Sequence, residues 1–157
     1  FIIRAPGHEP GRRLHLTSQT DMAPTVLDLL GLPALKNTHG ESMVPILRDR
    51  KAPWRTHTFS EYNGWMGGGW KMRAVMGERY KYIYHHDDHD EMFDLKKDPD
   101  ELTNIIGQTR RMDVADELRS RLVSFSWDTE DFLMPGWPHL AIDYGPSEKA
   151  TARRQQQ

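Results

Sequence analysis

The densest run of side chains that could do chemistry lies at residues 85–90, which have the sequence His-His-Asp-Asp-His-Asp. Imidazole and carboxylate groups are common metal ligands, and a tight loop could bring His85 close to His89. Asp and His also suit the polar turn of a β-hairpin, whereas metal sites usually draw their ligands from several elements. We therefore interpret this run as a solvated turn and predict no metal-binding residue in the chain.

A second segment carries groups suited to binding an organic ligand. Glu61 and Asn63 precede a glycine-rich loop, Trp65 and Trp70 flank it, and Arg73 follows it. Aromatic rings stack on sugar or aryl rings, carboxylate and amide groups bond to hydroxyls, and Arg makes forked bonds to sulfate or phosphate. The same residues fit a structural role, in which the tryptophans pack back on a sheet and Arg73 pairs with Glu61. The residue types alone leave both interpretations open.

Sequence motifs for nucleophilic catalysis are absent from the 157 residues. There is no Gly-x-Ser-x-Gly elbow, no phosphate-binding loop and no dinucleotide-binding fingerprint. The chain has no cysteine, which excludes disulfides, thiolate zinc sites and Cys nucleophiles within it and gives no indication of the redox compartment. Asp21 and Thr25 could be imagined as an acid/base pair, but a capped helix accounts for both. We predict no catalytic residue in this chain.

Two long segments carry the signals of helices. At 18–31, Asp21 can cap the helix, Pro24 lies in its first turn and Gly31 supplies a left-handed end. Its apolar stripe comprises Met22, Val26, Leu29 and Leu30. The segment 110–125 is amphipathic, and its apolar face comprises Ala115, Leu118, Leu122 and Phe125. Both patterns predict a helix with an apolar stripe along one face.

Four β-prone runs with short links predict an antiparallel sheet. They lie at 56–62, 71–76, 80–84 and 91–95. In the third run, alternation places Tyr80, Tyr82 and Tyr84 on one face. Such a row could stack on a ligand, but we favour a place in the core, because aromatic side chains are more often buried there.

Three shorter signals complete the prediction of elements. A short helix capped by Ser42 is expected around 40–47, and residues 98–101 have the pattern of a capping box that opens a brief helical turn. The apolar residues 1–3 resemble the end of a buried strand. We expect the residues after 130 to be an irregular tail.

Composition narrows the classes of partner. The formal net charge of −2 provides no field that would attract nucleic acid or an anionic membrane. No apolar run approaches the roughly 18 residues that span a bilayer. Val, Ile, Leu and Phe make up about a fifth of the chain, near the level at which a core becomes hard to bury. The chain starts at Phe1 without a signal-peptide pattern. We expect a piece of a longer protein that relies on a missing neighbour for part of its apolar burial.

Taken in order, several segments resemble the C-terminal part of a type I sulfatase, a member of the alkaline-phosphatase-like superfamily. The matching segments are 2–7, 20–33, 40–47, 59–61, 73–75, 80–83 and 92–105. The resemblance implies that residues 1–50 are the last strand and helices of a large α/β domain. Residues 51–130 would form a smaller α+β subdomain with a four-stranded antiparallel sheet and a C-terminal helix. Residues 131–157 would be the tail.

The resemblance also implies an activity for the whole enzyme. Type I sulfatases hydrolyse sulfate esters or sulfamates through a formylglycine made within a Cys/Ser-x-Pro-x-Arg segment, with a calcium ion beside it. That segment does not occur here, and Asp87-Asp88 lie too late in the sequence to match the family's metal-binding pair. We therefore expect this chain to be inactive alone, with no cofactor of its own. Its partner would be the N-terminal catalytic domain of the same polypeptide.

In such enzymes, loops of the smaller subdomain reach over the active site. The resemblance therefore favours a substrate-binding role for Glu61, Asn63, Trp65, Trp70 and Arg73, with a sulfated small molecule or glycan as ligand, although Arg73 could equally be structural. Two alternatives remain open: a related phosphodiesterase or phosphonate hydrolase, and a non-catalytic carbohydrate-binding or assembly module. Family membership suggests a periplasmic or secreted location.

Overall fold

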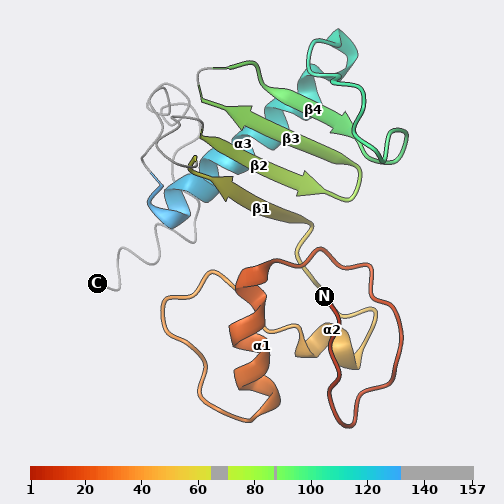
Figure 1. Cartoon of the computed structure of the whole chain (residues 1–157), viewed down its shortest axis with the longest axis vertical. Helices are drawn as coiled ribbons and strands as arrows, with labels where there is room; N and C mark the ends of the chain where they lie inside the picture. The colour runs from red at the N-terminus through yellow and green to blue at the C-terminus, as the bar shows by residue number, and fades with distance from the viewer. Residues whose placement is uncertain (65–70, 87, 132–157) are drawn as a thin grey trace. The chain divides into compact units, whose positions relative to one another are not determined.

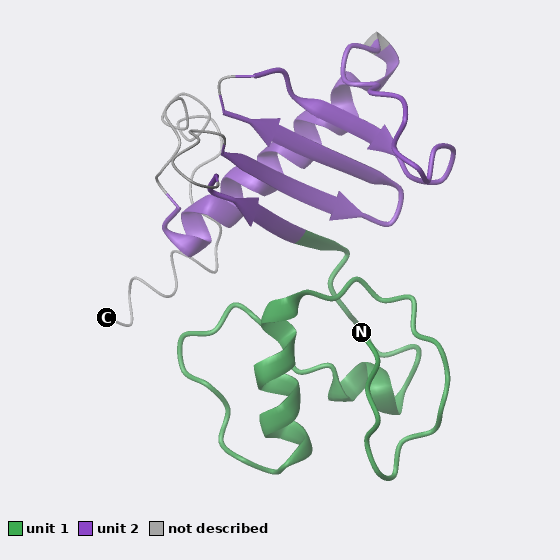
Figure 2. Ribbon diagram, viewed as in Figure 1, with its two compact units in different colours: residues 1–58 green, residues 59–157 purple. Residues whose placement is uncertain are grey.

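The computed structural model describes residues 1–64, 71–86 and 88–131. The chain divides into two compact units, unit 1 at residues 1–58 and unit 2 at residues 59–157 (Figure 2). The expected tail lies outside the described residues except for Asp131. No helix in the described ranges is long and apolar enough to cross a membrane. The assignment of 1–50 to a larger α/β domain stays a prediction.

Unit 1 contains the short 3-10 helix η1 (Gln19–Asp21) followed by α1 (Met22–Leu29). Ser18 caps η1 through a reciprocal capping box, in which the backbone N–H of Ser18 donates to the Asp21 carboxylate. Asp21 stands at the N-cap position of α1 but makes no side-chain capping bond there. Gly31, at φ +65°, ends the helix as predicted. The predicted helix is therefore confirmed, with a corrected cap.

The second helix of unit 1 is α2 (Val44–Arg48), shorter than the predicted 40–47 and shifted toward the C-terminus. Met43 takes the cap position, while the Ser42 hydroxyl accepts a bond from the Val44 N–H at 3.2 Å. The expectation of a buried strand at residues 1–3 is wrong for this structure. Within the described chain these residues form no strand and are exposed, because no neighbouring strand pairs with them.

Unit 2 is a four-stranded sheet covered on one face by a helix (Figure 1). The strands are β1 (His57–Tyr62), which begins at the end of unit 1, β2 (Met72–Gly77), β3 (Tyr80–His85) and β4 (Glu91–Asp94), in the order β1-β2-β3-β4. The β2–β3 and β3–β4 pairs are antiparallel, and Figure 1 shows β1 running opposite to β2. The predicted antiparallel sheet is confirmed.

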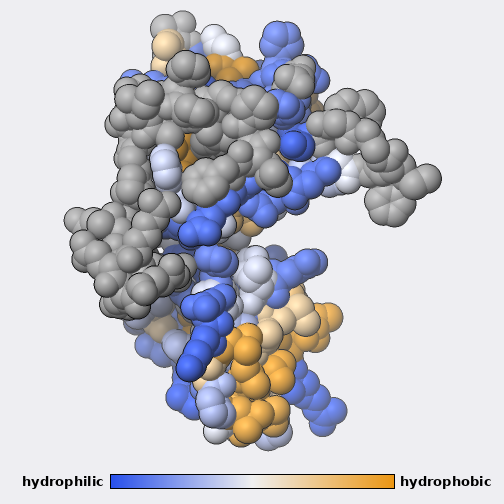
Figure 3. Space-filling view, turned by 90° about the vertical axis from the view of Figure 1, so that its left-hand side faces the viewer, coloured by the Kyte–Doolittle hydropathy of each residue, from blue (hydrophilic) through white to orange (hydrophobic). Residues whose placement is uncertain are grey.

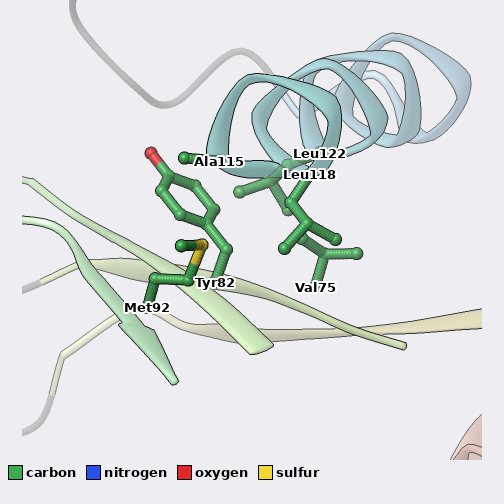
Figure 4. Close-up of a cluster of buried hydrophobic side chains, with 6 residues drawn as sticks. All are labelled: Val75, Tyr82, Met92, Ala115, Leu118 and Leu122. Atoms are coloured by element: carbon green, nitrogen blue, oxygen red, sulfur yellow. The ribbon is translucent and has the colours of Figure 1, made fainter. Parts of the chain in front are cut away.

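The covering helix is α3 (Met112–Thr129), preceded by the 3-10 turn η2 (Thr109–Arg111). Figure 4 shows its apolar residues meeting those of the strands. The core cluster comprises Val75, Tyr82, Met92, Ala115, Leu118 and Leu122, with Tyr80 and Tyr84 packed against it. The predicted core role of the tyrosine row is confirmed. Phe125 is less buried than predicted and stacks on Phe59, with ring centroids 4.3 Å apart.

Residues 98–101 do not open a helical turn. The Asp98 carboxylate accepts bonds from the N–H groups of Leu102 and Thr103, as in a capping role, but the chain there forms turns. Glu101 has φ +55° and its carboxylate accepts a bond from Lys81 at 2.7 Å instead of reaching back to Asp98. The left-handed conformation at Glu101 prevents helical continuation.

Candidate functional site

Arg73 is the central residue of the candidate site. It lies on β2, facing α3, and its side chain is only 1% exposed. The guanidinium donates five hydrogen bonds, which engage all five of its N–H groups. The acceptors are the Asp131 carboxylate at 2.5 and 3.1 Å, the Asn63 Oδ1 at 2.8 Å, and the carbonyls of Met72 and Tyr62 at 2.8 and 3.2 Å. We call Arg73, Glu61, Asn63 and Asp131 the Arg73 cluster.

The end of α3 positions Asp131 in this cluster. Glu130 adopts a left-handed conformation at φ +57°, and the Asp131 N–H then donates to the Ser126 carbonyl at 2.9 Å. This helix-terminating turn directs the chain back toward β2, so that the Asp131 carboxylate grips Arg73 in a forked pair. Asp131 is 8% exposed, and the pair is therefore a buried ion pair.

Glu61 and Asn63 present polar atoms outward from the cluster. The Asn63 Oδ1 accepts from Arg73, which orients the side-chain NH₂ group as the remaining donor. One Glu61 carboxylate oxygen lies 3.7 Å from the Arg73 Nε, and the Glu61 side chain is 39% exposed. A ligand at this surface would therefore meet one amide donor and one carboxylate acceptor, both attached to the end of β1.

A shallow groove of about 430 Å³ adjoins β1 on the α3 side of the sheet. Phe59 lies on the same strand as Glu61, two residues earlier, so both side chains point to the same face. The groove is lined by Phe59, Glu117, Ser120, Arg121, Ser124, Phe125 and Asp128. Its lining combines two aromatic rings with hydroxyl and charged groups.

The structure brings together three of the five predicted site residues, namely Glu61, Asn63 and Arg73. Trp65 and Trp70 lie outside the described residues. Sequence reasoning missed Asp131, which lies 58 positions from Arg73 in a segment expected to be an irregular tail. The local signal was weak, a pair of acidic residues at 130–131, separated by four residues from the end of the predicted helix.

Two residues of the acidic and histidine-rich run at 85–90, His85 and Asp90, form contacts with other side chains of unit 2. His85 lies at the end of β3 and its Nε2 is 2.8 Å from a Glu91 carboxylate oxygen. Tyr82 donates its hydroxyl to Asp90 and accepts a bond from Arg119 at 3.2 Å. Burial raises the pKa of the Tyr82 phenol, and the bond to Asp90 raises it further. Among the residues that the structure describes, no group of three His, Asp or Glu side chains could hold a metal ion.

Unit 1 contains a second buried charge, at Asp21, which is fully buried. Its carboxylate accepts four bonds, from the N–H groups of Ser18 and Glu41 at 2.7 and 2.9 Å and from both terminal nitrogens of Arg55 at 2.7 and 3.0 Å. These four hydrogen bonds occupy the lone pairs of the Asp21 carboxylate. Asp21 therefore joins three segments of unit 1, a role that the capped-helix interpretation did not foresee, and its oxygens are engaged within the chain.

Comparison with known proteins identifies the family. The family described as N-sulphoglucosamine sulphohydrolase, C-terminal, matches residues 1–128. The Delta 4,5-hexuronate-2-O-sulfatase of Bacteroides thetaiotaomicron is 30% identical over 157 aligned residues, which cover 93% of this chain and 31% of that protein. The chain thus spans less than a third of that relative's length.

Two solved structures share the fold. A protein determined in complex with its substrate D-glucosamine-2-N,6-O-disulfate matches with a TM-score of 0.65 and 27% identity, over 71% of this chain and 24% of its own. The phosphonate monoester hydrolase of Agrobacterium radiobacter matches with a TM-score of 0.62 and 27% identity, over 70% of this chain and 25% of its own. The chain therefore belongs to the alkaline-phosphatase-like sulfatase family and corresponds to its C-terminal region.

Proposed function

We propose that this chain forms part of the substrate-binding surface of a sulfatase that hydrolyses sulfate esters of a sugar. The observation that carries the proposal is the Arg73 cluster. A fully engaged, buried guanidinium fixes Asn63 and lies beside Glu61, while both of these side chains keep polar atoms at the surface. Groups held in place before binding lose little entropy when a ligand arrives.

The chemistry of the exposed groups suits a saccharide. A carboxylate accepts bonds from hydroxyls, and an amide NH₂ donates to hydroxyl or sulfate oxygens. Two relatives support this class of substrate, because one is a hexuronate-2-O-sulfatase and another was solved with a disulfated glucosamine. Arg73 acts here as a positioning residue, since its own donors are all engaged within the chain.

The sequence-level prediction for Trp65 and Trp70 belongs to the same proposal. Both follow Asn63 closely, and a tryptophan ring can stack on a sugar face. In the sulfatase that contains this region, replacing either tryptophan by Ala should raise KM or lower kcat/KM without changing the melting temperature. Unchanged kinetics for both variants would remove the tryptophans from the proposal.

The hydrolytic groups of a sulfatase do not fit on this chain. The family's activity implies a formylglycine and a calcium ion, yet the sequence has no Cys/Ser-x-Pro-x-Arg segment. The described residues also offer no cluster of three metal ligands. Because the formylglycine segment is absent from the sequence, we assign the reactive centre to polypeptide outside these 157 residues, and we expect the isolated chain to hydrolyse no sulfate ester.

The likeness to a phosphonate monoester hydrolase favours one competing function. The test compares a sulfated monosaccharide, a phosphonate monoester and a phosphodiester as substrates of the protein that contains this region. Preferential hydrolysis of the sulfate ester supports the proposal. Preferential hydrolysis of the phosphonate or the diester would replace it with the competing function, and binding of the sugar without any hydrolysis would indicate a binding module.

A further inference from the structure

The two units carry charge of opposite sign, although the whole chain is nearly neutral. Residues 1–58 contain eight Lys or Arg against five Asp or Glu, whereas residues 59–157 contain 13 against 18. Figure 3 shows hydrophilic side chains beside a gathering of hydrophobic ones on the surface of unit 1. Five of the eight cations lie in two short segments, 11–13 and 48–51, which contain a single acidic residue, Asp49. The positive charge of unit 1 is therefore concentrated in these two segments.

Arg13 joins the two segments and is held in a fixed orientation. Its Nε and Nη2 atoms donate to the carbonyls of Ile46 and Leu47, both at 2.9 Å. These carbonyls lie near the C-terminal end of α2, where a helix leaves acceptors without a partner of its own. Among the residues that the structure describes, no acceptor engages the Nη1 group of Arg13, which therefore remains a donor of fixed direction.

Gly11 allows the guanidinium of Arg50 to lie beside that of Arg13. The position that a Cβ of residue 11 would occupy is 2.1 Å from Arg50 Nη2 and 3.0 Å from Arg13 Nη1, so these two nitrogens are neighbours. Within the described part of the chain, Arg50 makes no hydrogen bond or ion pair. Asp49 pairs with no cation there and accepts the backbone N–H of Lys51 at 2.8 Å. We call Arg13 and Arg50 the arginine pair.

The arginine pair has the chemistry of a site for an oxyanion. Two neighbouring guanidinium groups repel each other, and an anion placed between them relieves that repulsion. Their planar donors form forked hydrogen bonds with sulfate, phosphate or carboxylate groups. We propose that the arginine pair binds a sulfate group carried on a glycan chain. The choice of sulfate among the oxyanions rests on the proposed function, but the site lies wholly in unit 1 and shares no residue with the Arg73 cluster.

The side chains around the arginine pair favour a sulfated glycan as the carrier of that anion. Arg12, Arg48 and Lys51 are exposed in the same two segments. Additional cations suit a chain that carries repeated anionic groups better than they suit one small anion. A single-stranded nucleic acid is disfavoured, because the two segments contain no aromatic residue on which a base could stack.

Binding to immobilised heparin octasaccharide, measured by surface plasmon resonance on the sulfatase that contains this region, tests the proposal. Arg50→Gln is compared with Arg110→Gln, the matched control that removes an exposed cation from unit 2. We expect Kd to rise about 10-fold in Arg50→Gln and to stay within about twofold in the control. Arg50→Lys keeps the charge but not the forked geometry and should lose most of the same affinity. Equal losses in Arg50→Gln and Arg110→Gln would overturn the proposal, since net charge alone would explain them.

Gly11→Ala tests the geometry of the pair without changing any charge. The added Cβ would displace the Arg50 guanidinium from its place beside Arg13. Gly7→Ala is the matched control, because Gly7 and Gly11 both have positive φ, +76° and +154°, but nothing lies within 4 Å of a Cβ at Gly7. We expect heparin binding to weaken several-fold in Gly11→Ala and to be retained in Gly7→Ala. Equal affinities of the two variants would contradict the pairing of Arg13 with Arg50.

Two further probes identify the source of the anion. A melting temperature that sodium sulfate raises more in the wild type than in Arg50→Gln, with no such difference in heparin binding, would assign the pair to free sulfate. A thymidine oligonucleotide that binds more tightly than heparin and depends on Arg50 would replace the glycan with a nucleic acid. Hydrolysis of a sulfated monosaccharide is assayed on the same samples. Heparin binding that depends on Arg50 without any hydrolysis keeps the site and rejects the proposed function, while hydrolysis with unchanged heparin binding in Arg50→Gln does the reverse.

Discussion

Both units contain a buried charged group that several segments satisfy, Asp21 in unit 1 and Arg73 in unit 2, and the partners of the two groups differ. In unit 1, Asp21 accepts four bonds from Ser18, Glu41 and Arg55, which join separate segments of that unit. In unit 2, Arg73 donates five bonds, and two of its neighbours, Glu61 and Asn63, retain polar atoms at the surface. A buried charge can therefore either fasten loops together or hold recognition groups in place. The exposure of its partners decides between the two roles.

The largest loss of stability in unit 2 is expected from removal of the Arg73 cation. Arg73→Met would remove the forked ion pair with the Asp131 carboxylate, which is 8% exposed. Removing one member of a buried ion pair typically costs about 3–5 kcal/mol. We expect a loss of this size in the free energy of unfolding, measured by urea denaturation. Arg73→Lys, which keeps the charge but not the forked geometry, should lose less, and a loss below 1 kcal/mol for Arg73→Met would show that the cluster is not a structural centre.

The corresponding change in unit 1 is Asp21→Asn. It would place an amide NH₂ group against donors from Ser18, Glu41 or Arg55 and remove the charge that balances Arg55. We expect a loss of about 3 kcal/mol. Hydrogen exchange should locate the loosening at η1, the Glu41 loop and Arg55. Amide protection in β2 and β3 should hardly change, and a uniform loss across both units would contradict separate roles for the two charges.

Gly40 allows a test of the close backbone packing in unit 1, because it lies beside the backbone of Thr20 and Asp21. A Cβ at Gly40 would approach the Thr20 carbonyl oxygen to 2.0 Å. Gly40→Ala should therefore lower the free energy of unfolding by about 2 kcal/mol through backbone displacement. Gly107→Ala is the matched control, since nothing lies within 4 Å of its added Cβ. Equal stability of the two variants would mean that the close approach at Gly40 relaxes without cost.

The smallest effect is expected at Asp94, where an ion pair is only half covered. The hydrogen bond from Arg79 holds the pKa of Asp94 below its usual value. Because the pKa is lowered on folding, the stabilisation is present above the unfolded-state pKa and is lost as pH falls through the folded-state pKa. Asp94→Asn should flatten this acid-dependent part of the unfolding free energy. Arg79 is 41% exposed, so the change in the unfolding free energy should be slight. An unaltered pH profile would show that the Arg79–Asp94 pair adds no stability.

Periodicity predicted the sheet and α3 well, because each buries a stripe against a partner within the chain. For α1 the same rule predicted the helix, but its apolar stripe at Val26 and Leu30 is exposed in the part of the chain that the structure describes. Glu61, Asn63 and Arg73 could be selected together because they are close in sequence. Asp131 could not, since only the left-handed turn at Glu130 and the packing of α3 on the sheet bring it to Arg73.

The most direct test of the account measures KM for a sulfated monosaccharide in the sulfatase that contains this region. The variants are Glu61→Ala and Asn63→Ala, with Lys97→Ala as the control at an exposed position. Each lost hydrogen bond to the sugar should raise KM by about 10-fold, since that factor corresponds to about 1.4 kcal/mol. The melting temperature of Glu61→Ala should match that of the control, whereas that of Asn63→Ala should fall, because the buried Arg73 guanidinium loses one acceptor. An unchanged KM in both variants would contradict the claim that the Arg73 cluster presents these two residues to substrate.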